Sequence, residues 1–99
     1  MNIYKVEQDS NAGYDTYDSF ICVAENEQEA RETHPSEFVT HSKNGKWYGT
    51  YSYGNKDEYE MDSGDWVRCN QINKLSVTLI GVANENQPKG IVLSSFNAG

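Results

Sequence analysis

The sequence is poor in the residues that most enzymes use for catalysis or metal binding. Its 99 residues include two histidines, His34 and His41, and two cysteines, Cys22 and Cys69. Neither histidine lies in a nucleophile motif, and no C-x-x-C or histidine-rich spacing accompanies the cysteines. His34 precedes a proline at a predicted helix end, and His41 lies within a predicted strand. We therefore expect no catalysis, no cofactor and no metal, and two buried free thiols.

Positive charge is also scarce. Eight Lys and Arg residues stand against 15 Asp and Glu, so the formal net charge is −7. A surface of this sign repels nucleic-acid phosphates and anionic membranes, and we expect no direct DNA or RNA binding. The same charge suits a basic protein partner, such as an enzyme with a positive DNA groove. It equally suits a protein that is acidic only for solubility.

Long apolar runs are missing from the sequence. It has no stretch of about 18 apolar residues, which a membrane-spanning helix requires. Residues 1–6 lack the basic region and apolar run of a signal peptide, so we expect a cytoplasmic protein. Seven tyrosines and an aromatic content of 12% distinguish the chain from a disordered one. Its length fits a single domain over residues 1–99.

Apolar and turn-forming residues predict six strands and one helix. Asn26, with Glu29 three residues later, is typical of a capped helix start, and His34-Pro35 predicts the helix end about two turns on. Ala30 is the small apolar residue that can face a sheet. The predicted strands span residues 3–8, 20–24, 38–43, 46–51, 75–82 and 90–96, with a short extended segment at 66–69. The expected fold is α+β: one antiparallel sheet built from hairpins, with one short helix packed on a face.

Three hairpins account for the predicted strands. The first joins strands 3–8 and 20–24 through a long tyrosine-rich connection. The second turns at Asn44-Gly45, which is the strongest short hairpin signal. A two-residue turn there pairs Ser42 with Trp47 and Phe38 with Tyr51. The third pairs the last two strands with each other.

The tyrosine-rich connection is the first candidate binding site. It contains the run GYDTYDS, in which Tyr14 and Tyr17 can stack on bases or on arginine side chains. Asp15 and Asp18 supply hydrogen-bond acceptors. The alternative is an ordinary structured loop, whose tyrosines cover the sheet edge and whose aspartates cap turns.

The second candidate site is an acidic stretch at residues 52–65, predicted to be an exposed loop. Its carboxylates are Asp57, Glu58, Glu60, Asp62 and Asp65. Their spacing does not match a calcium-binding loop. Nothing around them indicates the burial that would shift a pKa for acid–base chemistry. We expect a solvated acidic surface that is available to a partner.

The run GYDTYDS, then FICVAEN, EQEAR and HPS, the pair Trp66-Val67 and the closing SSFNAG together resemble a family of small proteins encoded by tailed bacteriophages and prophages. The resemblance covers nearly the whole chain, and GYDTYDS and FNAG are its most specific parts. It brings no catalytic residues to carry over. It implies a phage accessory gene, and small acidic proteins from such genes often inhibit host antiviral systems.

Two functional hypotheses follow. In the first, the protein docks on the basic groove of a host defence nuclease, as anti-CRISPR proteins do, through the five acidic residues with Tyr14 and Tyr17 as anchors. In the second, a homo-oligomer acts as a sponge for a cyclic nucleotide or related immune signal. Tyr14, Tyr17 or Trp47 would then stack the base, while Arg31, Arg68 or Lys46 would meet the phosphates. A phage structural or lysogeny part is a third possibility.

Overall fold

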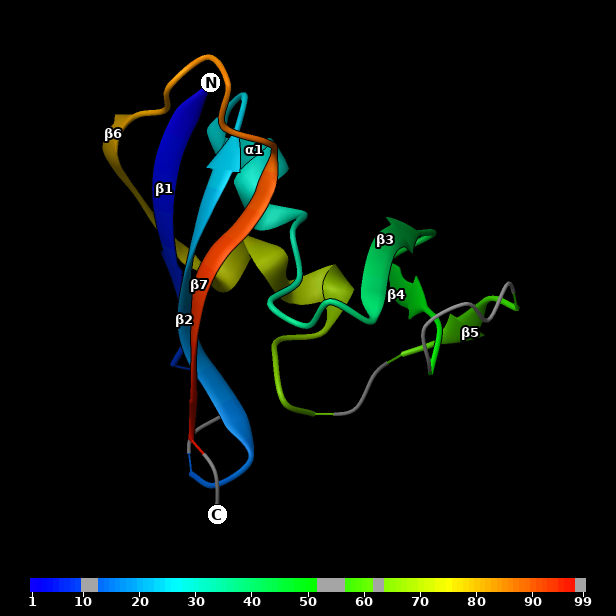
Figure 1. Cartoon of the computed structure of the whole chain (residues 1–99). Helices are drawn as coiled ribbons and strands as arrows, with labels where there is room; N and C mark the ends of the chain where they lie inside the picture. Colours follow the sequence, from blue (N-terminus) through cyan, green and yellow to red (C-terminus); the bar gives the residue numbers. More distant parts are fainter. Residues whose placement is uncertain (10–12, 52–56, 62–63, 98–99) are drawn as a thin grey trace.

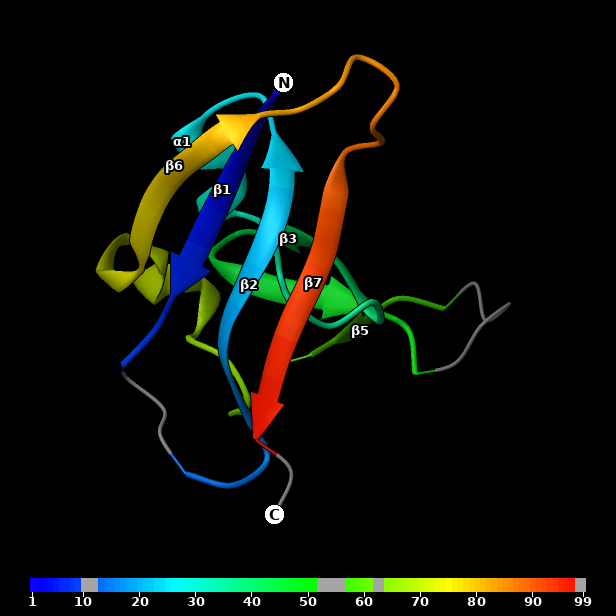
Figure 2. The same cartoon turned by 60° about the vertical axis from the view of Figure 1, so that its left-hand side comes forward.

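The regular structure of the protein consists mainly of strands in two antiparallel sheets (Figure 1). The computed structural model describes residues 1–9, 13–51, 57–61 and 64–97. The first sheet has the strand order β6-β1-β2-β7, seen side by side in Figure 2, and the second has the order β3-β4-β5. The strands are β1 (Asn2–Glu7), β2 (Thr16–Ala24), β3 (Val39–Lys43), β4 (Lys46–Gly49), β5 (Tyr59–Glu60), β6 (Ser76–Val82) and β7 (Gly90–Asn97).

One α-helix, α1 (Glu27–Arg31), and one 3-10 helix, η1 (Cys69–Lys74), accompany the strands. The protein is therefore mainly β. The predicted antiparallel strands and short helix are present, but the strands form two sheets where one was predicted. Among the described residues, no helix has the length and apolar character needed to cross a membrane.

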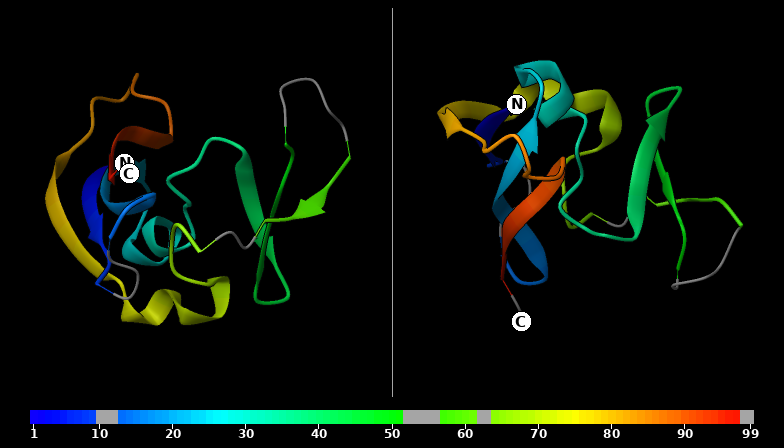
Figure 3. Two further views of the ribbon diagram at one scale, coloured as in Figure 1. Left: turned by 90° about the horizontal axis from the view of Figure 1, so that it is seen from below. Right: turned by 45° about the horizontal axis from the view of Figure 1, so that its top comes forward.

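Side-chain alternation decides which face of the four-stranded sheet is buried. Tyr4 and Val6 of β1 are buried, as are Phe20 and Cys22 of β2. The register pairs Tyr4 with Cys22 and Val6 with Phe20, so all four side chains lie on one face. α1 and the three-stranded sheet lie on that side (Figures 1 and 3).

The predicted pairing of the last two strands is wrong. β6 pairs with β1 and β7 pairs with β2, so β6 and β7 form opposite edges of the sheet. The β1–β2 hairpin occupies the centre of the sheet. β1 pairs with β6 on its outer side, and β2 pairs with β7 on its outer side. The connection at residues 83–89 crosses the end of the hairpin, where the Ala83 N–H donates to the Met1 carbonyl over 2.9 Å. It is also longer than the two to five residues of most hairpin loops.

α1 begins as its sequence predicts. The side-chain oxygen of Asn26 accepts a hydrogen bond from the Glu29 N–H over 2.8 Å, and the Glu29 carboxylate accepts from the Glu25 N–H over 3.1 Å. Ala30 is buried, as expected for the residue that faces the sheet. The helix ends at Arg31, earlier than the predicted two turns.

The second hairpin, β3–β4, turns at Asn44 and Gly45, where φ is 54° and 75°. Positive φ at both positions is what a tight two-residue hairpin requires, and Ser42 pairs with Trp47 as predicted. The predicted pairing of Phe38 with Tyr51 is wrong. A bulge at Thr40 shifts the register so that Val39 lies opposite Gly49.

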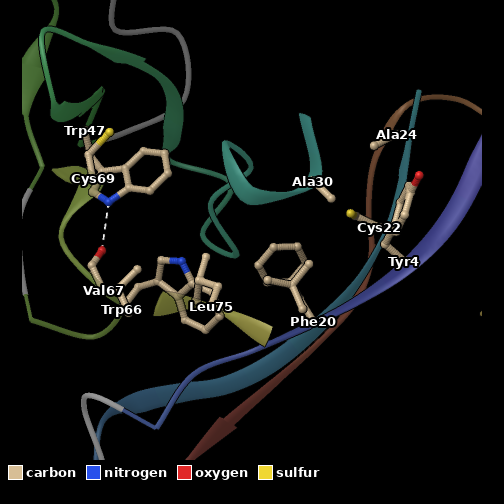
Figure 4. Close-up of a cluster of buried hydrophobic side chains, with 11 residues drawn as sticks. Tyr4, Phe20, Cys22, Ala24, Ala30, Trp47, Trp66, Val67, Cys69 and Leu75 are labelled. Atoms are coloured by element: carbon tan, nitrogen blue, oxygen red, sulfur yellow. Dashed lines mark hydrogen bonds between the residues drawn. The ribbon is translucent and has the colours of Figure 1, made fainter. Parts of the chain in front are cut away.

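Aromatic residues join the two sheets into one core (Figure 4). The ring of Trp66 packs on Phe20 at a centroid separation of 5.3 Å. The neighbouring Val67 carbonyl accepts a hydrogen bond from the Trp47 indole over 2.9 Å. Trp66 thereby contacts the four-stranded sheet while Val67 is tied to β4. The 3-10 helix that follows, η1, was not predicted.

Candidate functional site

Tyr14 is the most prominent side chain of the tyrosine-rich loop. Its residue is 81% exposed, although the backbone around it is tied down. The N–H of Asp15 donates to the Asn97 carbonyl at the end of β7, and the Thr16 hydroxyl donates to the Gly13 carbonyl over 3.0 Å. Asp15 has a φ of 60°, in the left-handed region that non-glycine residues seldom adopt. A constrained turn therefore presents a large ring to solvent.

Tyr17 behaves differently from Tyr14. It belongs to β2, which begins at Thr16, four residues before Phe20, the predicted start of that strand. Its half-buried ring packs on Phe96 of β7 with centroids 4.7 Å apart. Burial raises the pKa of Tyr17, and the nearby Asp65 carboxylate raises it further. Tyr17 thus joins the loop to the edge strand β7.

The aspartates of the loop lie at the same end of the sheet. Asp18 is exposed at a bulge of β2, where it has no partner residue on β7. Asp9 is exposed just beyond β1. Among the described residues, neither Asp9 nor Asp18 forms an ion pair with Lys or Arg. We call these four exposed residues at this end of the sheet, Tyr14, Asp9, Asp15 and Asp18, the acidic–aromatic tip.

A groove lies beside β7. It consists of two adjoining hollows of about 490 Å³ and about 380 Å³, which share Ser36, Glu37 and Ile91 in their linings. Residues 89–91 and Ser94 line it on the β7 side, and residues 32–41 line it on the other. Tyr17, which precedes Asp18 in the chain, lines the hollow nearer the tip.

His34 lies at the wall of this groove but is buried. Its Nδ1 accepts a hydrogen bond from the Ser36 N–H over 2.9 Å, so the ring proton resides on Nε2. Nε2 lies 4.0 Å from the Asp65 carboxylate, and the ring packs edge-on against Trp47. Burial lowers the His34 pKa to about 4, against the opposing effect of Asp65. This is the arrangement of a neutral histidine held by the core.

His41 lies between a hydroxyl and a carboxylate. Its Nδ1 shares a hydrogen bond with the Thr40 hydroxyl over 2.9 Å, and its Nε2 is 2.5 Å from a Glu58 oxygen. The series of Thr40 hydroxyl, His41 imidazole and Glu58 carboxylate resembles the nucleophile, base and orienting acid of a catalytic triad. However, the His41 side chain is 44% exposed, so water reaches the whole series. The hydrogen bond from His41 lowers the pKa of Glu58, and the nearby Lys43 ammonium lowers it further.

The predicted acidic loop does not form one acidic patch. Tyr59 and Glu60 form strand β5 beside β4, which corrects the prediction of an irregular loop. Glu58 also pairs with Lys43 at 3.3 Å, and Glu60 pairs with Lys46 at 3.7 Å. The remaining carboxylates separate: Asp57 is exposed beside β5, Asp65 lies next to His34, and Asp62 is outside the described residues.

Two residues assigned to nucleotide binding have structural roles instead. Trp47 is only 2% exposed, so its ring cannot stack on a base. The Arg31 guanidinium donates to the carbonyls of Ile72 and Leu75 over 3.0 and 2.7 Å and pairs with Glu27 at 2.9 Å. These bonds hold α1 against the end of η1.

The other two predicted cations, Lys46 and Arg68, line a hollow of about 160 Å³ that also contains Glu60. Ligand pockets usually measure about 300–1,000 Å³. Within one chain, the residues predicted to hold a nucleotide therefore do not converge on a site of suitable size.

Cys22 and Cys69 are buried free thiols, as predicted. Figure 4 places them at opposite ends of the core. Burial raises the pKa of Cys22 to about 11 and also raises that of Cys69. Both groups are therefore protonated, unreactive core residues near neutral pH.

The edge strand β7 was missed as part of a site. Its sequence, GIVLSSFN, contains no charged residue, although 23% of the whole chain is charged. An uncharged strand in a charged chain is the sequence feature that could have indicated a binding edge. The predicted pairing of β7 with the preceding strand left no free edge to consider. The chain matches no family model, no curated protein and no solved structure.

Proposed function

We propose that this protein is a binding protein that inhibits a host antiviral defence system by docking on a basic surface of a nucleic-acid-handling protein. The single observation that carries the proposal is the acidic–aromatic tip. There, an 81% exposed Tyr14 projects from a turn that two hydrogen bonds and a left-handed Asp15 hold in place. A fixed turn reduces the ordering cost of binding.

The chemistry of the tip suits a surface rich in arginine. Tyr14 offers a ring face to a guanidinium, and Asp9, Asp15 and Asp18 offer exposed carboxylates at the same end of the sheet. Grooves that bind DNA or RNA are rich in Arg and Lys, and a protein of net charge −7 is attracted to them. The resemblance of GYDTYDS to phage proteins supports a target in the bacterial host.

The two histidines support binding rather than turnover. His34 is neutral, packed and hydrogen-bonded to the backbone, so its proton-accepting nitrogen is already occupied. His41 is open to water and paired with Glu58. A general base must be shielded from water and must have an unoccupied nitrogen that can accept a proton, and neither histidine meets both conditions.

The test is inhibition of purified CRISPR-associated and restriction nucleases by this protein. We expect stoichiometric inhibition of DNA cleavage by at least one of them, relieved by excess DNA and weaker at about 0.5 M salt than at about 0.1 M. Tyr14→Ala and the double change Asp15→Asn with Asp18→Asn should reduce the inhibition. Glu85→Gln, on the connection at the opposite end of the sheet, is the control.

Inhibition that is unaffected by these changes would reject the tip, and no inhibition across the panel would reject the proposal. Cyclic nucleotides should leave the melting temperature unchanged. A rise in their presence would favour the sponge instead, because a tight ligand stabilises the folded state.

A further inference from the structure

We propose that the free edge of β7 binds an extended segment of the partner, rich in basic and apolar residues, by adding it to the sheet as a further strand. This inference rests on the proposed function and specifies how the partner is held. β7 pairs with β2 on one side, and within the described residues no strand pairs with its other side. Its backbone N–H and C=O groups on that side are a template for another strand.

The side chains of β7 lack the usual protection of an edge strand. Exposed edges are normally blunted by charged residues or proline, and β7 contains neither. Leu93 is 66% exposed and Phe96 is 47% exposed. The pairing with β2 is interrupted by a bulge at Val92 of β7 and by a second bulge at Asp18 of β2, opposite Ser95 and Phe96. Because the second extra residue lies on β2, residues 93–97 of β7 have no extra residue of their own and are the stretch best suited to accept a strand.

The opposite edge strand, β6, has exposed apolar residues as well, but it lacks the accompanying groove. Among the described residues, β6 contributes none to the lining of either hollow beside β7. The hollows lie below the edge of β7, between Ile91, Ser94 and residues 35–38. In strand addition, the backbone supplies affinity, and hollows of this kind receive every second side chain of the added strand.

The charge of the groove selects the occupant. Glu32 and Glu37 line it, while the Lys89 ammonium is paired with Glu25 at 3.7 Å and with Glu29 at 3.2 Å. A segment with lysine or arginine side chains therefore complements the groove. A second copy of this chain would bring the same two carboxylates, and another net charge of −7, to the shared edge. The observations favour a basic partner segment over self-association.

One end of β7 also lies next to the acidic–aromatic tip. Tyr17 lines the hollow nearer the tip and packs on Phe96, and the Asp15 N–H donates to the Asn97 carbonyl at the end of β7. A basic segment laid along β7 would therefore end beside Tyr14 and the aspartates.

The test uses a fluorescent, end-blocked peptide in which lysine alternates with isoleucine. Two further versions carry N-methyl groups on one or the other alternate set of backbone nitrogens. Only one set can face β7, so we expect one methylated peptide to bind at least about tenfold more weakly and the other to bind like the parent. Amide exchange measured by NMR should slow in β7 on binding and stay unchanged in β6.

Two matched charge reversals locate the site. Glu37→Lys should weaken binding severalfold, whereas Glu85→Lys, which makes the same charge change on the connection between β6 and β7, should leave it unchanged. A peptide that alternates glutamate with isoleucine should not bind.

If both sets of methyl groups weaken peptide binding equally, or if neither set weakens it, strand addition is overturned. If amide exchange slows in β6 on binding, the assignment of the peptide to the edge of β7 is overturned. Slow exchange in β7 without peptide, together with a dimer in sedimentation, would assign the edge to a second copy. If nuclease inhibition still depends on Tyr14 while the peptide fails these tests, the proposed function stands and only this inference falls.

Discussion

The indole N–H of Trp47 donates a hydrogen bond to the Val67 carbonyl over 2.9 Å, and this bond fixes β4 to the segment that leads into η1. Trp66, one residue earlier, packs on Phe20 of the four-stranded sheet at 5.3 Å. The three-stranded sheet is small, and strands of this size are unstable alone. Its position beside β7, and hence the groove, depends on these contacts.

Trp47→Phe should therefore destabilise the fold. The change removes the donor and leaves a buried carbonyl without its bond, at a cost of about 1–3 kcal/mol in the free energy of unfolding. Urea denaturation measures this cost. Tyr51→Phe, at a largely exposed ring, is the control and should change the free energy by less than about 0.5 kcal/mol. Equal midpoints for the two variants would show that the bond does not hold the sheets together.

Gly49→Ala should be more damaging than any other exchange of a described glycine for alanine. A Cβ at position 49 would lie 1.8 Å from the Phe38 carbonyl oxygen, which itself accepts a hydrogen bond from the Thr50 N–H. The backbone cannot move without breaking the bulge at Thr40. We expect loss of the native β3–β4 pairing in NMR spectra. At Gly81, a Cβ would meet only a side-chain carbon at 3.8 Å, so Gly81→Ala should fold normally.

Acid should unfold the protein partly through His34. Burial lowers its pKa from 6.5 to about 4 in the folded state, so the unfolded chain binds the proton more readily. The stabilising contribution of neutral His34 is complete above pH 6.5 and falls as the pH drops toward 4, by up to roughly 3 kcal/mol. His34→Phe should flatten this part of the pH profile of unfolding. A profile identical to that of the native protein would contradict the assignment.

Arg31 should matter for stability and not for ligand binding. Its fork bridges two carbonyls and a carboxylate, a geometry that lysine cannot reproduce. Arg31→Lys should cost about 1–2 kcal/mol in thermal or urea unfolding. Lys46→Met removes an exposed ion pair with Glu60 and should cost less than about 0.5 kcal/mol. Equal effects would mean that the Arg31 contacts contribute little.

Local signals in the sequence predicted local structure well. The Asn26 cap, the Asn44-Gly45 turn and the burial of Ala30 depend on neighbouring residues, and each is present. Pairing between strands that are distant in the sequence was harder to predict. β6 and β7 follow each other in the chain, yet each pairs with a strand of the central hairpin because that hairpin leaves both sides open. At the bulge at Thr40, the backbone of Phe38 and Val39 closely approaches Gly49 on the paired strand, a contact that the turn signal alone does not indicate.

The candidate site was predictable only in part. The sequence pointed to Tyr14 and Asp15, which share one exposed turn, and to Asp18, which is exposed in the strand that follows. It could not show that Trp47 is buried or that Arg31 is bonded to η1, since both roles depend on residues far along the chain. It also could not show that Glu58 and Glu60 face cations on neighbouring strands. The groove could not be predicted because its two sides, residues 32–41 and 89–94, are more than 45 residues apart in the sequence.

Site-specific photo-crosslinking tests most directly whether the tip meets the partner. A photoreactive benzoyl-phenylalanine would replace Tyr14 in one protein and Glu85 in a matched control, each expressed in bacterial cells and irradiated. We predict that position 14 captures a basic nucleic-acid-handling protein, that about 0.5 M salt before irradiation suppresses this product, and that position 85 captures none. Equal capture of the same protein from both positions, or no capture from position 14, would contradict the account.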